Sequence, residues 1–479
     1  MLFNSIEFAI FLPLVFLIYW FPLKRKLDLQ NLFLLAASYF FYGWWDWRFL
    51  GLIILSSALD FYVGQRVHAE QNIKKKKLLL YLSIGFNLGM LGFFKYYNFF
   101  VESFVEAFTL FGAPLEASTL HILLPVGISF YTFQTLSYTI DIYRGQLEPS
   151  KEIIPFFTFV SFFPQLVAGP IERAKALLPQ FYVNREFDLE RAKDGLRQIL
   201  WGLFKKMVIA DNCALFANEI FGSPEAHSGS TLLLGAIFFA FQIYGDFSGY
   251  SDIAIGTARL LGFDLMQNFA TPYFSRDVGE FWRRWHISLS TWFRDYLYIP
   301  LGGSRVSKAK VIRNTFIIFL VSGFWHGANW TFLIWGGIHA ILFLPLIIFD
   351  LNRKNLGTVA EGRLLPNPKE LLQMLSNFLI VSLAWIFFRA GSLSEAFTYF
   401  SGLFSKSLFS APSLSAERLM LIAGIGFLLT LEWRNRTELH TLAKLEKLPI
   451  AIRWVGYIGL VWGILLFGGQ PQSFIYFQF

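Results

Sequence analysis

The chain has 479 residues, of which 55% are hydrophobic and 15% are charged. Soluble globular proteins carry about 25% charged residues, so this composition excludes an ordinary water-soluble fold. The formal net charge is +8, but the basic residues gather in short segments between apolar runs, which is typical of membrane topology and not of nucleic-acid binding. The sequence therefore predicts a polytopic protein of the lipid bilayer that binds no nucleic acid.

The first apolar run covers residues 1–23. Its basic residues, Lys24, Arg25 and Lys26, follow the run instead of preceding it, and no small-residue cleavage site is evident. We therefore expect a retained first span and not a signal peptide. The single cysteine, Cys213, excludes an intramolecular disulfide and any paired cysteine metal site, and we expect no metal.

Further apolar runs recur along the whole chain, and each is a candidate helix. The runs cover residues 6–23, 31–45, 49–64, 78–94, 99–111, 121–143, 153–167, 196–221, 231–261, 311–325, 331–349, 371–388, 419–432 and 454–467. Several are shorter than the ~20 residues that a straight span needs, so we expect tilted or broken helices, about 10 to 13 in all. The predicted fold class is an all-α polytopic membrane protein. No linker rich in Pro, Gly or Ser divides it, so residues 1–479 are predicted to form a single transmembrane domain.

Orientation follows from lysine and arginine, which favour the cytoplasmic side of a membrane. Five basic segments lie between the runs, at residues 24–26, 66–77, 305–313, 353–369 and 434–453. When all five are placed in the cytoplasm, the N-terminus and the tail at residues 470–479 both lie outside. We therefore expect both termini on the extracytoplasmic face.

His326 directly follows the apolar run 311–325, which begins within the third basic segment. A helical rise of 1.5 Å per residue from Arg313 places His326 about 20 Å into a hydrocarbon core that is about 30 Å thick. A neutral imidazole at that depth can act as a general base that activates a hydroxyl group. Gly323 and Gly327 flank it and are expected to leave room for a substrate. The alternative is a histidine that only packs between helices and bonds a backbone carbonyl.

His286 lies among Trp282, Arg283, Arg284 and Trp285. A single helix over residues 281–298 would carry aromatic and charged groups on nearly every face, which indicates an interfacial or re-entrant segment. The two arginines could hold phosphates bidentately, such as those of coenzyme A, and the two tryptophans join them as candidate donor-binding residues. The alternative is that the arginines only extend toward lipid headgroups.

Two aspartates, Asp246 and Asp252, lie between long apolar runs and are expected to form structural ion pairs with Arg259, Arg283 or Arg284. Residues 165–170 read as a break in a span, and such breaks are tolerated at membrane depth where they line a cavity. No Walker loop, dinucleotide fingerprint, zinc spacing or Gly-x-Ser-x-Gly elbow occurs. Nucleotide hydrolysis, redox chemistry and classical serine hydrolysis are therefore disfavoured.

The last six residues, 474–479, read FIYFQF. Such an aromatic hexamer either anchors at the membrane interface or folds back into the helical bundle. In the second case it could present the hydroxyl group of Tyr476 to an acyl donor, because tyrosine can act as a covalent nucleophile. The phenol would then need a base such as His326.

These residues resemble the membrane-bound O-acyltransferase superfamily, and in particular its bacterial branch of alginate and peptidoglycan O-acetyltransferase membrane subunits. The motifs that carry the resemblance are FPQLVAGPI, YGDFSGYSDIAIG, EFWRRWHISLSTWFRDYLYIPLGG, GFWHGANW and the terminal FIYFQF. The resemblance implies a ring of tilted helices around a transmembrane tunnel, in the bacterial inner membrane. It also implies that His326 is catalytic, that His286 is a second functional histidine and that Tyr476 relays the acyl group.

The resemblance further implies the donor and the partner. Acetyl-coenzyme A would enter from the cytoplasm as a substrate, with no permanently bound cofactor. A periplasmic partner similar to serine hydrolases would pass the acetyl group to an exported or cell-wall polysaccharide. Two other readings stay open on the residues alone: a transporter or flippase, since buried charges and broken helices fit it equally well, and a scaffold of a polysaccharide export complex.

Overall fold

The computed structural model describes residues 1–110, 119–120, 122–472 and 474–475. Within these ranges the chain is built from helices and contains no strand. Six helical segments are long and apolar enough to cross a membrane: Leu27–Ala69, Ile73–Thr109, Gly229–Leu260, Trp330–Ile348, Pro368–Arg389 and Ile450–Phe467. The prediction of an all-α polytopic membrane protein is therefore confirmed. The ring of helices around a tunnel stays a prediction.

The described chain forms two compact units. The first consists of Met1–Ala192 with Ala258–Leu265, and the second of Lys193–Thr257 with Met266–Phe479. The single transmembrane domain stays a prediction.

The first unit contains eight α-helices among its described residues. They are α1 (Ile6–Trp20), α2 (Leu27–Asp46), α3 (Leu50–Ala69), α4 (Ile73–Leu110), α5 (Ile128–Tyr143), α6 (Ile153–Ser161), α7 (Phe163–Leu166) and α8 (Ala174–Leu177). The two spans expected at residues 78–94 and 99–111 are wrong, because α4 is one continuous helix of 38 residues. No glycine or proline separates the two apolar runs, so the helix continues through them and is about 57 Å long.

Helices α3, α4 and α5 pack together around a buried carboxylate, Asp60. Asp60 accepts hydrogen bonds from Ser83 Oγ at 2.5 Å, Asn87 Nδ2 at 2.8 Å and Thr139 Oγ1 at 3.2 Å. An ionisable group inside an apolar helix bundle is tolerated when neighbouring groups satisfy it, and here hydroxyl and amide groups do so. This network ties the three helices together.

The second unit holds the remaining α-helices and two π-helical segments. They are α9 (Leu189–Leu203, which begins at the end of the first unit), the π-segment Phe204–Ala210, α10 (Asp211–Gly222), α11 (Gly229–Leu260), α12 (Val278–Arg284), α13 (Ile287–Phe293), the π-segment Arg294–Tyr298, α14 (Lys308–His326), α15 (Trp330–Ile348), α16 (Pro368–Arg389), α17 (Leu393–Leu403), α18 (Ala416–Arg434) and α19 (Ile450–Phe467). Helix α11, the longest of this unit, ends at Leu260, in the part of the chain that returns to the first unit.

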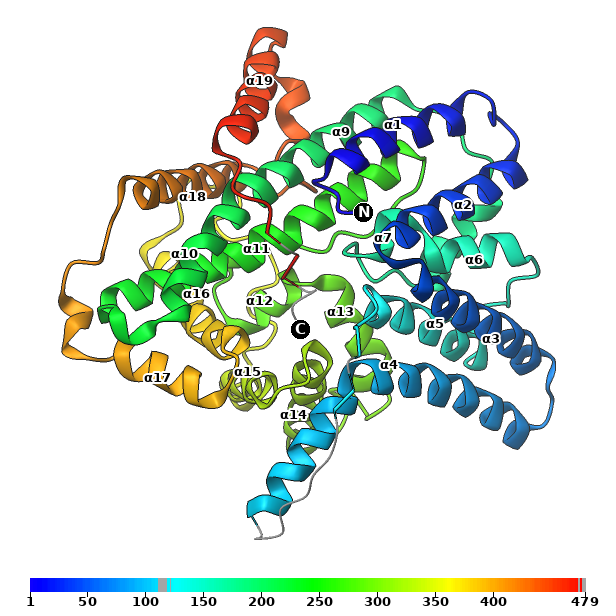
Figure 1. The fold of residues 1–479 in the computed structure, drawn as a ribbon, viewed down its shortest axis with the longest axis horizontal. Helices are drawn as coiled ribbons and strands as arrows, with labels where there is room; N and C mark the ends of the chain where they lie inside the picture. The colour runs from blue at the N-terminus through cyan, green and yellow to red at the C-terminus, as the bar shows by residue number, and fades with distance from the viewer. Residues whose placement is uncertain (111–118, 121, 473, 476–479) are drawn as a thin grey trace. The chain divides into compact units, whose positions relative to one another are not determined.

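Helices α9 and α11 approach each other through small residues (Figure 1). A side-chain carbon on Gly202 would lie only 2.5 Å from the carbonyl oxygen of Gly249, and one on Gly249 would lie 2.8 Å from that of Gly202. In membrane proteins such small residues let helix backbones pack closely. This contact fixes α11 against α9 and the π-segment that follows it, and charged residues of α11 and the π-segment form ion pairs with each other.

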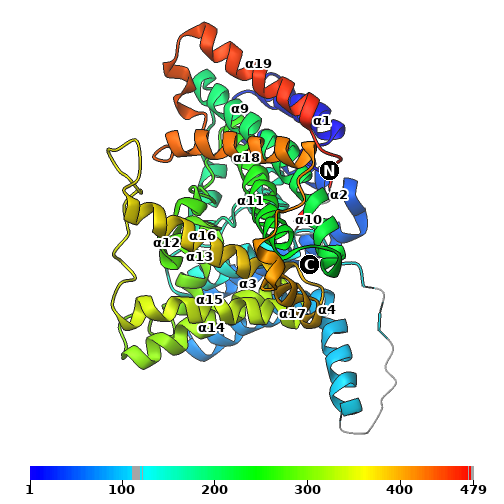
Figure 2. The ribbon, with the colours of Figure 1, turned by 90° about the vertical axis from the view of Figure 1, so that its left-hand side faces the viewer.

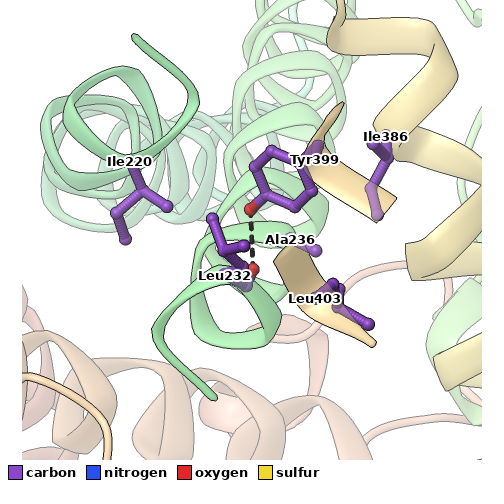
Figure 3. Close-up of a cluster of buried hydrophobic side chains, with 6 residues drawn as sticks. All are labelled: Ile220, Leu232, Ala236, Ile386, Tyr399 and Leu403. Atoms are coloured by element: carbon purple, nitrogen blue, oxygen red, sulfur yellow. Dashed lines mark hydrogen bonds between the residues drawn. The ribbon is translucent and has the colours of Figure 1, made fainter. Parts of the chain in front are cut away.

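A hydrophobic cluster joins α10, α11, α16 and α17 (Figure 3). Its buried members are Ile220, Leu232, Ala236, Ile386, Tyr399 and Leu403. The hydroxyl group of Tyr399 donates a hydrogen bond of 2.6 Å to the carbonyl oxygen of Leu232, so the one polar group of the cluster is satisfied.

Candidate active site

His326 is the last residue of α14, and α15 begins four residues later, so the two helices form an antiparallel pair that runs side by side (Figure 2). Glycines make this close pairing possible. A side-chain carbon on Gly323 would collide with the carbonyl oxygen of Phe332, and one on Gly336 would collide with that of Phe319. The hairpin therefore holds His326 on a rigid support.

The His326 side chain is 4% exposed and lies among aromatic rings. Its ring centre is 4.9 Å from that of Trp325, 5.1 Å from Trp335 and 5.2 Å from Phe388. The expectation that Gly327 leaves room for a substrate is wrong, because the Phe332 ring occupies the space that a side chain there would need. Both flanking glycines serve helix packing.

Residues 281–298 do not form one helix, and the interfacial or re-entrant placement of this segment stays a prediction. The helix is interrupted between α12 and α13 at His286, whose φ of 45° lies in the left-handed region. The reason is a competing partner: Asn268 accepts the Ile287 N–H on its carbonyl oxygen at 2.9 Å and the Ser288 hydroxyl on its side chain at 2.9 Å. A non-glycine residue with positive φ is uncommon, and such strain clusters at functional sites.

One tryptophan brings the two histidines together. The Trp325 ring centre is 6.1 Å from that of His286 and 4.9 Å from that of His326. His286 is 1% exposed and packs edge-on against Phe247 at 4.6 Å. The structure therefore places both predicted histidines in one aromatic layer, contributed by α11, the α12–α13 break and α14.

A cavity of about 370 Å³ opens beside this layer. Ser322, one helical turn before His326, contributes to its wall, whereas His326 is not among the described residues that line it. Three arginines and several apolar side chains share the cavity. The lining includes Trp282, Arg283, Arg294, Phe319, Ser322, Phe343 and Arg353.

The four residues predicted to bind a donor separate into two pairs. Trp282 and Arg283 line the cavity. Arg284 does not; its Nη2 forms an ion pair of 3.0 Å with Glu280 Oε1, and its Nη1 donates to the Ala270 carbonyl oxygen at 3.2 Å. Trp285 is buried and lies 5.2 Å from the Trp385 ring. The latter two side chains are thus held inside the fold.

A third buried histidine, His339 on α15, escaped the sequence reasoning. Its Nδ1 accepts a hydrogen bond from Trp282 Nε1 at 3.3 Å, and its ring lies 5.0 Å from that of Trp335. It thereby supports a tryptophan of the cavity wall. The signal was available, since an ionisable residue inside an apolar helix is a functional candidate by itself.

Asp246 and Asp252 form the expected structural ion pairs, but the predicted partners were wrong. Lys206 Nζ lies 2.8 Å from Asp246 Oδ1, and Lys205 Nζ lies 2.6 Å from Asp252 Oδ2. Both lysines belong to the π-helical segment after α9. Their signal in the sequence was a lysine pair within the apolar run 196–221.

Tyr476 lies outside the described residues, but Phe474 and Ile475, which precede it, are buried. The Phe474 ring lies 4.6 Å from that of Tyr250 and 5.9 Å from that of Phe247, the ring that also contacts His286. Of the two alternatives for the tail, the described part folds back into the helices.

The comparisons with known proteins fit this arrangement. The chain is 38% identical to "Probable alginate O-acetylase AlgI" of Pseudomonas putida over the full length of both chains. The chain belongs to the membrane-bound O-acyltransferase family. The model of that family matches residues 150–383 of this acyltransferase, a range that contains His286, His326 and the cavity.

Two further relatives support the same assignment. The acyltransferase is 41% identical to "Probable alginate O-acetylase AlgI" of Pseudomonas aeruginosa, over 88% of this chain and 78% of the relative. It is 37% identical to "Peptidoglycan O-acetyltransferase" of Helicobacter pylori, over 87% of this chain and 82% of the relative. The protein is therefore a membrane-embedded O-acyltransferase.

Proposed function

We propose that this acyltransferase moves an acetyl group from cytoplasmic acetyl-coenzyme A across the bacterial inner membrane toward an exported or cell-wall polysaccharide. The observation that carries the proposal is the cavity of about 370 Å³, which combines arginines and apolar walls one helical turn from His326. The acceptor class follows the relatives, whose names specify alginate and peptidoglycan acetylation.

The cavity suits a phosphorylated thioester. Its volume falls within the ~300–1,000 Å³ typical of small-molecule sites. Arg283, Arg294 and Arg353 are proposed to bind the phosphates of coenzyme A. One guanidinium group can donate two parallel N–H hydrogen bonds to the oxygens of one phosphate. The apolar part, which includes Phe319 and Phe343, would hold the pantetheine arm with its thioester toward Ser322.

His326 is the proposed general base. It takes the proton of an acceptor hydroxyl while that oxygen forms a bond to the acetyl carbonyl carbon. The carbon–sulfur bond then breaks, and the leaving thiolate of coenzyme A recovers the proton from the imidazolium. Arg283 and Trp282 bind the donor, and His286 shapes the site through Trp325.

The first acceptor hydroxyl is proposed to be that of Tyr476, after which a periplasmic partner similar to serine hydrolases receives the acetyl group. This order explains how an acetyl group leaves the compartment to which coenzyme A is confined. It requires a tail that the periplasmic partner can reach, and both termini are proposed to lie on the periplasmic side.

The proposal is tested with the purified full chain and acetyl-coenzyme A labelled in the acetyl group, by measuring released coenzyme A and label bound to protein. We expect His326→Gln to abolish both. The matched control is His440→Gln, another buried histidine of the same unit, which bonds Asp194 at 2.8 Å and lies apart from the cavity lining.

A parent protein that releases no coenzyme A under any condition would count against acyl transfer and favour a transporter. Equal activity of the His326→Gln and parent proteins would refute the base.

A further inference from the structure

The segment after α19, residues 468–475, has no regular helix in its described part, yet Phe474 and Ile475 are buried in the second unit. Irregular backbone inside a membrane protein must have its N–H and C=O groups satisfied by other protein groups. Its first contacts are with the π-segment and α10: Gly469 N donates to the Met207 carbonyl oxygen at 2.9 Å, and Asn212 Nδ2 donates at 2.8 Å to the carbonyl oxygen of Phe467, the last residue of α19.

The next contacts involve charged side chains. Lys206 Nζ donates to the Gln472 carbonyl oxygen at 3.0 Å, and Asp246 Oδ2 accepts the Ile475 N–H at 2.7 Å. One cation and one anion thus satisfy one acceptor and one donor of the irregular backbone.

The Lys206 ammonium group lies among three oxygen atoms. It donates a hydrogen bond to the Gln472 carbonyl oxygen and forms ion pairs with Asp246 Oδ1 and Asp211 Oδ1, each at 2.8 Å. The side chains of these three charged residues are at most 4% exposed. A buried ion pair adds little net stability compared with apolar packing, so its presence calls for another role.

Two consecutive lysines of the π-helical segment reach different partners. Lys205 turns to Asp252 and Ser248, whereas Lys206 turns to Asp246 and Asp211. Such π-segments are rare and occur frequently at functional sites.

We propose that Lys206, Asp211 and Asp246 form a latch that holds residues 469–475 in the helical unit and thereby positions Tyr476 for acyl transfer. The three are positioning residues, and this last step rests on the proposed function. The link to the histidines is a series of ring contacts from Phe474 to Phe247 at 5.9 Å and from Phe247 to His286 at 4.6 Å. Loss of the latch should release the segment and leave the donor cavity intact.

Labelling of a cysteine in the full-length purified protein tests the latch. Ile475→Cys introduces a thiol at a buried position of the segment, and the native Cys213 on α10, fully buried, reports general unfolding in the same molecule. We expect Lys206→Met and Asp246→Asn to increase the maleimide labelling rate at position 475 by about tenfold. The first removes the donor to the Gln472 carbonyl oxygen, and the second removes the carboxylate charge that pairs with Lys206 and strengthens the bond from the Ile475 N–H. The rate at Cys213 should stay unchanged.

The control is Arg418→Met, which removes a buried cation paired with Glu219 at 2.8 Å elsewhere in the unit. It should leave labelling at position 475 unchanged. An unchanged rate at 475 in the two latch variants, or an equal increase at 475 and Cys213, would overturn the latch.

The transfer step is measured separately. In Lys206→Met and Asp246→Asn we expect the kcat for protein acetylation to fall at least about tenfold while KM for acetyl-coenzyme A is maintained, because the cavity lining is untouched. Faster labelling with undiminished transfer would refute the positioning role. Labelling does not require acyl transfer, so failure of the latch and failure of the proposed function are distinguishable.

Discussion

The close pairing of α14 and α15 leads to a sharp prediction about two adjacent glycines. A side-chain carbon on Gly336 would collide with the carbonyl oxygen of Phe319, whereas one on Gly337 would meet only Leu320 Cδ2, at 3.9 Å. Alanine in place of glycine favours a helix by about 1 kcal/mol. Gly337→Ala should therefore be neutral or stabilising by up to about 1 kcal/mol.

Gly336→Ala has the same helix-propensity gain but must push two backbones apart. Overpacking typically costs about 1–3 kcal/mol, and a backbone oxygen cannot move aside as the end of a flexible side chain can. We expect a net loss of up to about 2 kcal/mol, together with reduced coenzyme A release, because the displaced α14 carries His326.

The assay is thermal unfolding of both variants in the same detergent, followed by activity at a temperature where both are folded. The adjacent glycine supplies the control, since the chemical change is identical. If Gly336→Ala proved as stable and as active as Gly337→Ala, the idea that glycine contact fixes the α14–α15 hairpin would be refuted.

Three other substitutions separate the roles of residues in the second unit. Arg283→Met should raise KM for acetyl-coenzyme A about tenfold with a small effect on kcat, as steady-state kinetics will show, because it removes one of the arginines proposed to bind the donor phosphates. Tyr399→Phe should lower stability by about 1 kcal/mol, measured by thermal unfolding, through loss of the bond to Leu232, and leave activity per folded molecule unchanged. Asn268→Ala should lower kcat, measured as coenzyme A release, because the Ser288 hydroxyl and the bend at His286 lose a partner; an unchanged kcat would separate that bend from catalysis.

The sequence was sufficient for the helical class, and it singled out His286 and His326 as candidates, because both signals are local. Apolar runs reveal spans, and a histidine inside such a run stands out against its surroundings. That His286 and His326 contact one tryptophan was not predictable, since the contact depends on the break before α13. That break is caused by Asn268, a residue distant enough in sequence that no local pattern reveals it.

The charged residues show the same limit. Asp246 and Asp252 are paired as expected, but not with Arg259, Arg283 or Arg284. Their partners, Lys206 and Lys205, lie in a π-helical segment, which leaves no clear sequence signature. The glycines beside His326 were misread for a similar reason, since only the packed structure shows that Phe332 fills the space at Gly327.

Helix α4 has a geometric consequence for the first unit. Its 38 residues extend about 57 Å, and even a tilt of about 40° leaves a projection of about 44 Å along the membrane normal, against a hydrocarbon core of about 30 Å. At least about 14 Å of this rod must therefore stand in the headgroup layer or in water. Helix α4 is therefore a stiff rod that reaches beyond the hydrocarbon layer, with the exposed Phe100 and Phe104 toward its C-terminal end.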